Sequence, residues 1–195
     1  PETDTLYLPI DTTQKTGSTY CQEFDVSFER PSDFLIVIDG AENSRVLVQE
    51  RYEVLRAMFL HETEDRDPYL EPVDVDTPVF KPIKLMLQTA TPLLTGNWQA
   101  SSETYETGKL TYGNANPADE DFNSLADFIF SGDYVELKLP WQLLNFSNPS
   151  EMMIHDDYYQ HYGVENLQID TMYVGVSDEE QKECRIHMAP LHLEG

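Results

Sequence analysis

The sequence predicts an all-β fold: a jelly-roll-like β-sandwich with one or two short helices. Three observations support this class. Residues Tyr134–Leu139 alternate between polar and apolar, roughly eight or more short strand-like segments are separated by turn residues, and a proline-rich stretch at 61–82 excludes a regular helix. The length of 195 residues suits a single domain over residues 1–195. Because the chain begins at Pro1 without a signal-like segment, we expect it to be excised from a larger protein.

The N-terminal part is predicted to supply three strands. Residues 1–19 form an N-terminal arm in which Leu6–Leu8 is an edge strand. Glu23–Glu29 alternates between apolar and polar residues and is broken by Pro31–Asp33. Phe34–Ile38 is continuously apolar and β-branched, which is typical of a central strand buried on both faces.

The middle of the chain is less regular. Arg45–Leu60 is interpreted as a strand followed by a short helix or a bend, and a second strand fits its tail equally well. His61–Pro82 carries four prolines among acidic residues, so it forms either a long functional loop or a strand that covers an edge. Ile83–Gln88 and Tyr105–Tyr112 are predicted strands.

The C-terminal part contains the clearest pattern. Leu125–Phe130 is predicted to be a strand that leads through the hairpin turn Ser131–Asp133 into the alternating strand. Leu167–Val176 and Ile186–Leu193 supply two further strands.

The alternating strand ends in a predicted helical hook. Its apolar face consists of Val135, Leu137 and Leu139. Pro140 lacks an N–H group and suits the first position of a helix. Trp141 and Leu144 are three residues apart, so both are expected to pack into the core.

The segment Tyr134–Phe146 resembles the E-x-x-I-P-W-x-x-L element of family-9-like carbohydrate-binding modules, in which it follows an earlier strand of the type Phe34–Asp39. The resemblance covers about 30 residues and is more specific for fold than for ligand. It implies a non-catalytic carbohydrate-binding or accessory module of a larger extracytoplasmic, carbohydrate-active bacterial protein. The implied partners are a glycan or polysaccharide and neighbouring domains, at the cell surface or outside the cell.

The charge of the chain limits its other partners. Twelve Lys and Arg against 36 Asp and Glu give a formal net charge of −24. This charge repels phosphate backbones and anionic lipids, which argues against nucleic acid and membrane surfaces. No apolar run approaches the roughly 18 residues of a membrane span, so membrane insertion is not expected.

Trp98 is the main candidate for stacking on a sugar ring, because it lies in a loop that contains glycine. Asn97 and Gln99 flank it and can bind sugar hydroxyls, and Tyr105 and Tyr112 are expected to line the same face. The alternative is that Trp98 closes one end of the sandwich.

His155–Tyr162 is the densest cluster of polar and aromatic residues. Asp156 and Asp157 are candidate calcium ligands, because calcium prefers oxygen and can add loop carbonyls. The alternative is a turn in which an aspartate caps the next segment and the tyrosines are half-buried.

Catalytic motifs are absent: the sequence contains no G-x-S-x-G, no P-loop and no H-E-x-x-H. We therefore expect a non-enzyme. Two other functions stay open: an interaction domain without its own ligand, and a glycosidase or lyase, which needs only two converging carboxylates. Cys21 and Cys184 either form a disulfide or stay reduced and separately buried, and the second state is the default.

Overall fold

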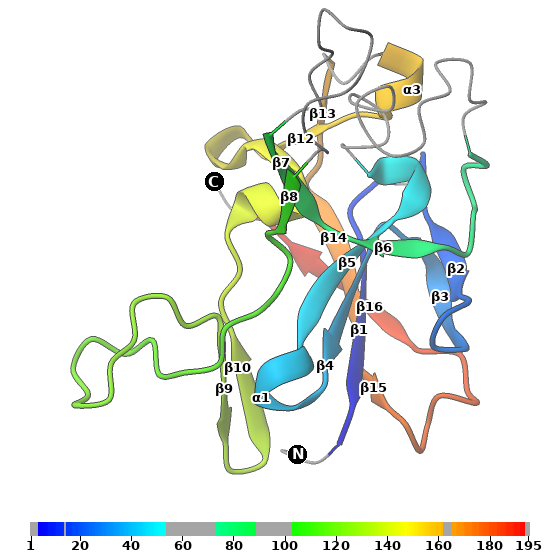
Figure 1. Cartoon of the computed structure of the whole chain (residues 1–195). Helices are drawn as coiled ribbons and strands as arrows, with labels where there is room; N and C mark the ends of the chain where they lie inside the picture. Colours follow the sequence, from blue (N-terminus) through cyan, green and yellow to red (C-terminus); the bar gives the residue numbers. More distant parts are fainter. Residues whose placement is uncertain (1–3, 14, 54–72, 89–102, 162–164, 194–195) are drawn as a thin grey trace, which may run out of the picture.

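The computed structural model describes residues 4–13, 15–53, 73–88, 103–161 and 165–193. The fold is all-β, as predicted, and each helical segment in the described ranges is a single turn (Figure 1). The helical turns are α1 (Gly40–Asn43), η1 (Glu50–Tyr52), η3 (Trp141–Leu144), η4 (Pro149–Glu151) and α3 (Tyr158–His161). No helix in the described ranges has the length and apolar character needed to cross a bilayer.

An antiparallel sheet forms the centre of the molecule (Figure 1). Its strand order is β16-β14-β1-β4-β5-β6, and β15 also pairs with β1. These strands are β1 (Leu6–Asp11), β4 (Phe34–Ile38), β5 (Arg45–Gln49), β6 (Phe80–Pro82), β14 (Thr171–Gly175), β15 (Ser177–Asp178) and β16 (Met188–His192). The central position predicted for Phe34–Ile38 is confirmed. The edge position predicted for Leu6–Leu8 is wrong, because β1 has neighbours on both sides.

In the part of the chain that the structure describes, four small antiparallel sheets accompany the central one. They pair β2 with β3, β7 with β8, β9 with β10, and β11 with β12 and β13. Their strands are β2 (Ser18–Cys21), β3 (Val26–Ser32), β7 (Lys84–Gln88), β8 (Glu103–Glu106), β9 (Phe128–Ser131), β10 (Tyr134–Leu137), β11 (Phe146–Asn148), β12 (Met153–His155) and β13 (Asn166–Gln168).

The central sheet is buried on both faces, which explains the continuous apolar run in β4. Phe34, Ile36 and Ile38 belong to one core cluster, together with side chains from β9, η3, β11, β12 and α3. Leu35 and Val37 belong to a second cluster, together with side chains from β2, β3 and β6. Successive side chains of a strand point to opposite faces, so each face has its own core. The jelly-roll-like sandwich topology stays a prediction.

The hairpin β9–β10 follows the predicted course. Gly132 has a positive φ of 60° at the turn, and Ser131 pairs with Tyr134. The apolar face of the strand packs against the first core cluster through Val135, Leu137 and Leu139. The predicted alternation is therefore confirmed.

The hook differs from the prediction in one side chain. Leu143 and Leu144 are buried, whereas Trp141 is 42% exposed and its ring lies against Phe146 with 4.8 Å between centroids. The prediction that Trp141 packs into the core is wrong, because the single 3-10 turn directs Leu143 inward instead. Asn145, with a left-handed φ of 60°, ends the turn.

Other elements also depart from the sequence pattern. Leu167–Val176 forms two strands in different sheets, β13 and β14, rather than one. The predicted strand at Tyr105–Tyr112 ends with β8 at Glu106. Cys21 and Cys184 are both free, which agrees with the default, but only Cys21 is buried.

Candidate functional site

Two of the aromatic residues predicted to bind a sugar lie in the described part of the chain. Asn97, Trp98 and Gln99 lie outside the described residues. Tyr105 lies on β8 and is 61% exposed. Tyr112 is 36% exposed, and its ring packs against Phe128 and Phe130 of β9 at centroid distances of 5.4 and 5.6 Å. Tyr105 thus lies in the β7–β8 sheet, whereas Tyr112 lies outside the named strands and packs on β9.

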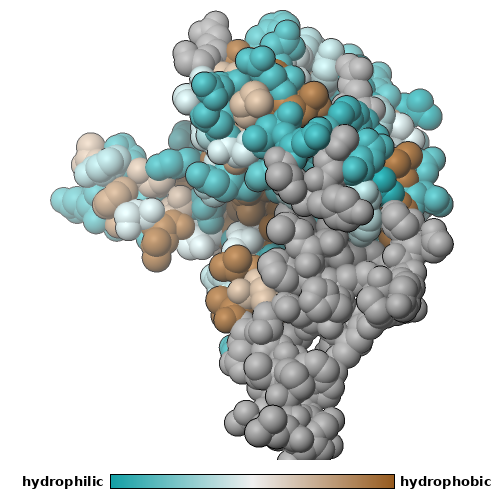
Figure 2. Space-filling model, turned by 90° about the horizontal axis from the view of Figure 1, so that it is seen from above, coloured by the Kyte–Doolittle hydropathy of each residue, from teal (hydrophilic) through white to brown (hydrophobic). Residues whose placement is uncertain are grey.

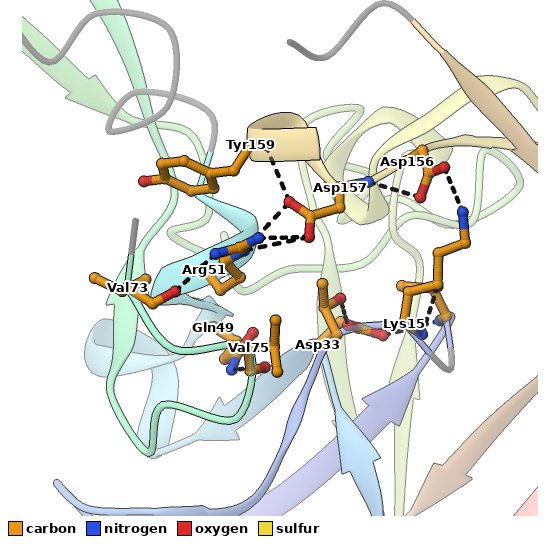
Figure 3. A network of polar contacts seen from close by, with 11 residues as sticks. Lys15, Asp33, Gln49, Arg51, Val73, Val75, Asp156, Asp157 and Tyr159 are labelled. Atoms are coloured by element: carbon orange, nitrogen blue, oxygen red, sulfur yellow. Dashed lines mark hydrogen bonds and ion pairs between the residues drawn. The ribbon is translucent and has the colours of Figure 1, made fainter. Parts of the chain in front are cut away.

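The two candidate calcium ligands each bind a basic side chain (Figure 3). Asp156 accepts a hydrogen bond of 2.6 Å from Lys15 Nζ, and its other oxygen accepts one from the backbone N of Asp157. Asp157 accepts hydrogen bonds from Arg51 Nε and Nη2, the latter at 2.8 Å, and one from the backbone N of Tyr159.

These contacts match the capped turn that the sequence offered as the alternative. Tyr158 is buried, Tyr159 is half-buried, and the Arg51 guanidinium lies 4.6 Å from the centre of the Tyr159 ring. In the described ranges, no three His, Cys, Asp or Glu side chains gather into a group that would hold a metal. Calcium binding stays a prediction, and thermal melts with and without a chelator test it, since a bound ion stabilises the native state.

An open cavity of about 580 Å³, which the sequence does not predict, lies between the loop after β1 and the segment that joins β13 to β14. Its polar lining comes from Thr12, Thr13, Lys15, Gln168, Asp170 and Thr171. Its apolar lining comes from Met152, Leu167, Ile169, Tyr173 and Leu193. No local motif indicates this cavity, because its residues come from distant parts of the chain.

Asp33 holds one wall of the cavity in place. Its carboxylate is fully buried and accepts hydrogen bonds from the backbone N of Thr12 (2.9 Å), the backbone N of Thr13 (3.0 Å) and Oγ1 of Thr16 (2.6 Å). Thr12 Oγ1 adds a fourth at 3.1 Å. Burial raises the pKa of Asp33 to about 7, although these donors favour the charged form. One carboxyl group therefore fixes the loop that carries Lys15.

An ion pair holds the second wall. The Arg30 guanidinium lies 3.5 Å from the centre of the Tyr173 ring, and its Nε donates to Asp11 at 2.9 Å. Burial raises the pKa of Asp11 to about 6, and Arg30 opposes this rise. One face of Tyr173 is thus occupied by a cation within the fold, which fixes the ring beside the cavity.

The remaining groups give the cavity a mixed character. Gln168 Nε2 donates to the backbone O of Glu151 at 3.2 Å, and Thr171 Oγ1 lies 3.0 Å from His192 Nδ1. Asp170 adds an exposed carboxylate at the wall. Such a lining suits a ligand that has both hydroxyl groups and apolar faces.

Comparison with family models, with curated proteins and with solved structures finds no match for this chain. The resemblance to carbohydrate-binding modules therefore rests on the Tyr134–Phe146 segment and on the earlier strand at Phe34–Asp39.

Proposed function

We propose that this chain is a non-catalytic carbohydrate-binding domain, acting as a binding or accessory module of a larger extracytoplasmic, carbohydrate-active protein. Its partners would be a glycan and the neighbouring domains of that protein, at the cell surface or outside the cell. The observation that carries the proposal is the open cavity beside Thr13, Gln168 and Asp170.

The cavity supports this proposal through size and chemistry. A volume of about 580 Å³ falls within the range of small-ligand sites. A sugar ring presents hydroxyl groups at its rim and C–H groups on its faces. Hydroxyl, amide and carboxylate groups of the lining suit the rim, and Ile169, Leu193 and Met152 suit the faces.

The number of carboxylates in the cavity favours binding over catalysis. Glycosidases place two carboxyl groups on either side of the bond that they cleave. Among the described residues that line the cavity, Asp170 is the one acidic residue. Asp156 lies beyond Lys15 and forms an ion pair with it.

A glycan array followed by isothermal titration calorimetry tests the proposal. In Asp170→Ala and Gln168→Ala we expect the affinity for the bound glycan to fall about tenfold or more, because each change removes hydrogen bonds to the ligand. Matched controls are Asp121→Ala and Gln142→Ala, which are also exposed but lie outside the cavity. If no glycan binds to the intact chain, the proposal is wrong.

Trp98→Ala separates the two candidate sites. Loss of binding in this variant, with the cavity variants unchanged, would place the glycan at residues 97–99 and remove the cavity from the proposal. The opposite pattern would place it in the cavity.

A further inference from the structure

A second cavity, of about 550 Å³, forms an apolar groove between the central sheet and the β9–β10 hairpin. Its floor comes from β1, β4 and β10 through Leu6, Leu8, Ile38, Val135 and Leu137. It shares no lining residue with the cavity proposed to bind a glycan. It is therefore a separate surface, and an inference about it goes beyond the carbohydrate-binding function.

Two exposed apolar side chains form the walls of this groove. Tyr134 on β10 is 76% exposed, and Val176, between β14 and β15, is 63% exposed. Single exposed apolar residues are ordinary, but here two of them stand beside a continuous apolar floor. On the face shown in Figure 2, hydrophilic residues make up much of the described surface, with smaller hydrophobic areas between them. An occupant that covers both walls would remove a contiguous apolar surface from water.

The charges around the groove indicate what kind of occupant it suits. Asp4 and Asp133 lie among its lining residues, and none of the described lining residues is a lysine, arginine or histidine. Asp39 is close to the same end of the sheet, where it accepts a hydrogen bond from Thr5. The whole chain has a formal net charge of −24. Electrostatic repulsion therefore disfavours a second copy of this chain and an anionic lipid surface. Electrostatic attraction favours a cationic partner.

We propose that this groove binds a peptide segment of a partner protein, in which large apolar side chains are flanked by lysine or arginine. The apolar side chains lie on the floor between Tyr134 and Val176, and the basic residues face Asp133. Apolar burial supplies most of the affinity, and the carboxylates at the rim select the sign of the partner's charge.

Selection from a displayed library of random peptides, about 12 residues long, tests the proposal with the intact chain as bait. We expect enrichment of sequences with an apolar centre and basic flanks. The best peptide and a version with glutamate at its basic positions are then synthesised and titrated calorimetrically. The glutamate version should bind at least about tenfold more weakly. Added salt should lower the affinity of the basic peptide for the chain.

Two variants with matched controls locate the site. Val176→Ser should weaken the selected peptide about tenfold through lost apolar contact, and Asp133→Lys about threefold through charge reversal. Leu191→Ser and Asp121→Lys change exposed residues of the same types outside the groove and should bind as the original chain does. Circular dichroism and a melting curve check that each variant folds.

Several results would overturn the proposal. The selection could enrich acidic or purely polar sequences, or it could enrich no peptide. Alternatively, Val176→Ser and Leu191→Ser could lower the affinity for the selected peptide equally. Sedimentation that shows a dimer abolished by Val176→Ser would assign the groove to a second copy. Flotation with phosphatidylcholine vesicles that depends on Val176 would assign it to a lipid surface. Either outcome replaces the peptide as occupant.

Discussion

Arg51 and Asp157 form an ion pair in which the two side chains are only 10% and 0% exposed. Replacing Asp157 by alanine leaves the guanidinium buried without its carboxylate, although Val73 O still accepts from Arg51 Nη1. We expect the free energy of unfolding to fall by about 3–5 kcal/mol, the cost typical of breaking a buried ion pair. Urea denaturation measures this loss.

The matched control for this variant is Lys182→Ala, which removes the partner of Glu179 in an ion pair of 2.8 Å whose two side chains are 35% and 46% exposed. Its effect should be much smaller, because exposed pairs contribute little. If both variants lost the same free energy of unfolding, burial would not determine the cost of breaking an ion pair.

Asp33 is expected to make stability depend on pH with an unusual sign. Its pKa in the folded chain is raised from 3.8 to about 7 by burial. The folded state therefore holds a proton that the unfolded state releases, and this contribution to stability is present below about pH 4 and is lost as the pH rises through about 7. Asp33→Asn should reduce the fall in unfolding free energy between these values.

Urea denaturation at several pH values measures that difference between Asp33→Asn and the original chain. Asp121→Asn, at an exposed position, is the control and should keep the original slope. An unchanged slope in Asp33→Asn would mean that other groups produce the pH dependence.

For individual side chains, the sequence indicated which charged groups cluster but not which basic residues pair with them. The cluster at 155–162 is visible as a local pattern, and the capped turn was among its interpretations. Lys15 and Arg51, which pair with Asp156 and Asp157, are 141 and 106 positions away. No spacing rule covers such separations, because the fold alone brings the partners together.

Among the elements, the hook at Trp141–Leu144 offers a direct comparison of two side chains. Leu144 is 5% exposed in the first core cluster, whereas Trp141 is 42% exposed. We expect Leu144→Ala to lower the free energy of unfolding by about 2–4 kcal/mol, in the range for buried leucines. Trp141→Ala should cost less despite its larger side chain, and chemical denaturation compares the two. A larger loss in Trp141→Ala would contradict the exposed position of the ring.

Local patterns predicted the elements better than they predicted the arrangement of the elements. The period of two in Tyr134–Leu139, the turn at Ser131–Asp133 and the apolar run of β4 depend on neighbouring residues, and all three are confirmed. The position of β1 depends on strands far along the chain, so Leu6–Leu8 was wrongly assigned to an edge. Local patterns did not predict the cavity proposed to bind a glycan either, because its lining residues also come from distant parts of the chain.

For the whole molecule, the net charge of −24 predicts a response to salt. Like charges repel more strongly in the compact state than in the expanded one, and dissolved ions screen this repulsion. We expect Tm to rise by several degrees between about 0.01 and about 0.3 M NaCl, measured by calorimetry. KCl should give the same rise if screening is the cause. A fall in Tm would show that ion pairs such as Lys15–Asp156 outweigh the repulsion.

The place of β1 in the central sheet has a consequence for biosynthesis. One side of β1 pairs with β4, and the other pairs with β14 and β15. On the ribosome, the nascent chain can complete the first pairing early, whereas the second must wait until residues 171–178 have been translated. During that interval the free hydrogen-bonding edge of β1 is open to other strands, and premature termination would leave it so. A chaperone that shields this edge would therefore be useful from the time β4 has paired with β1 until residues 171–178 have been made.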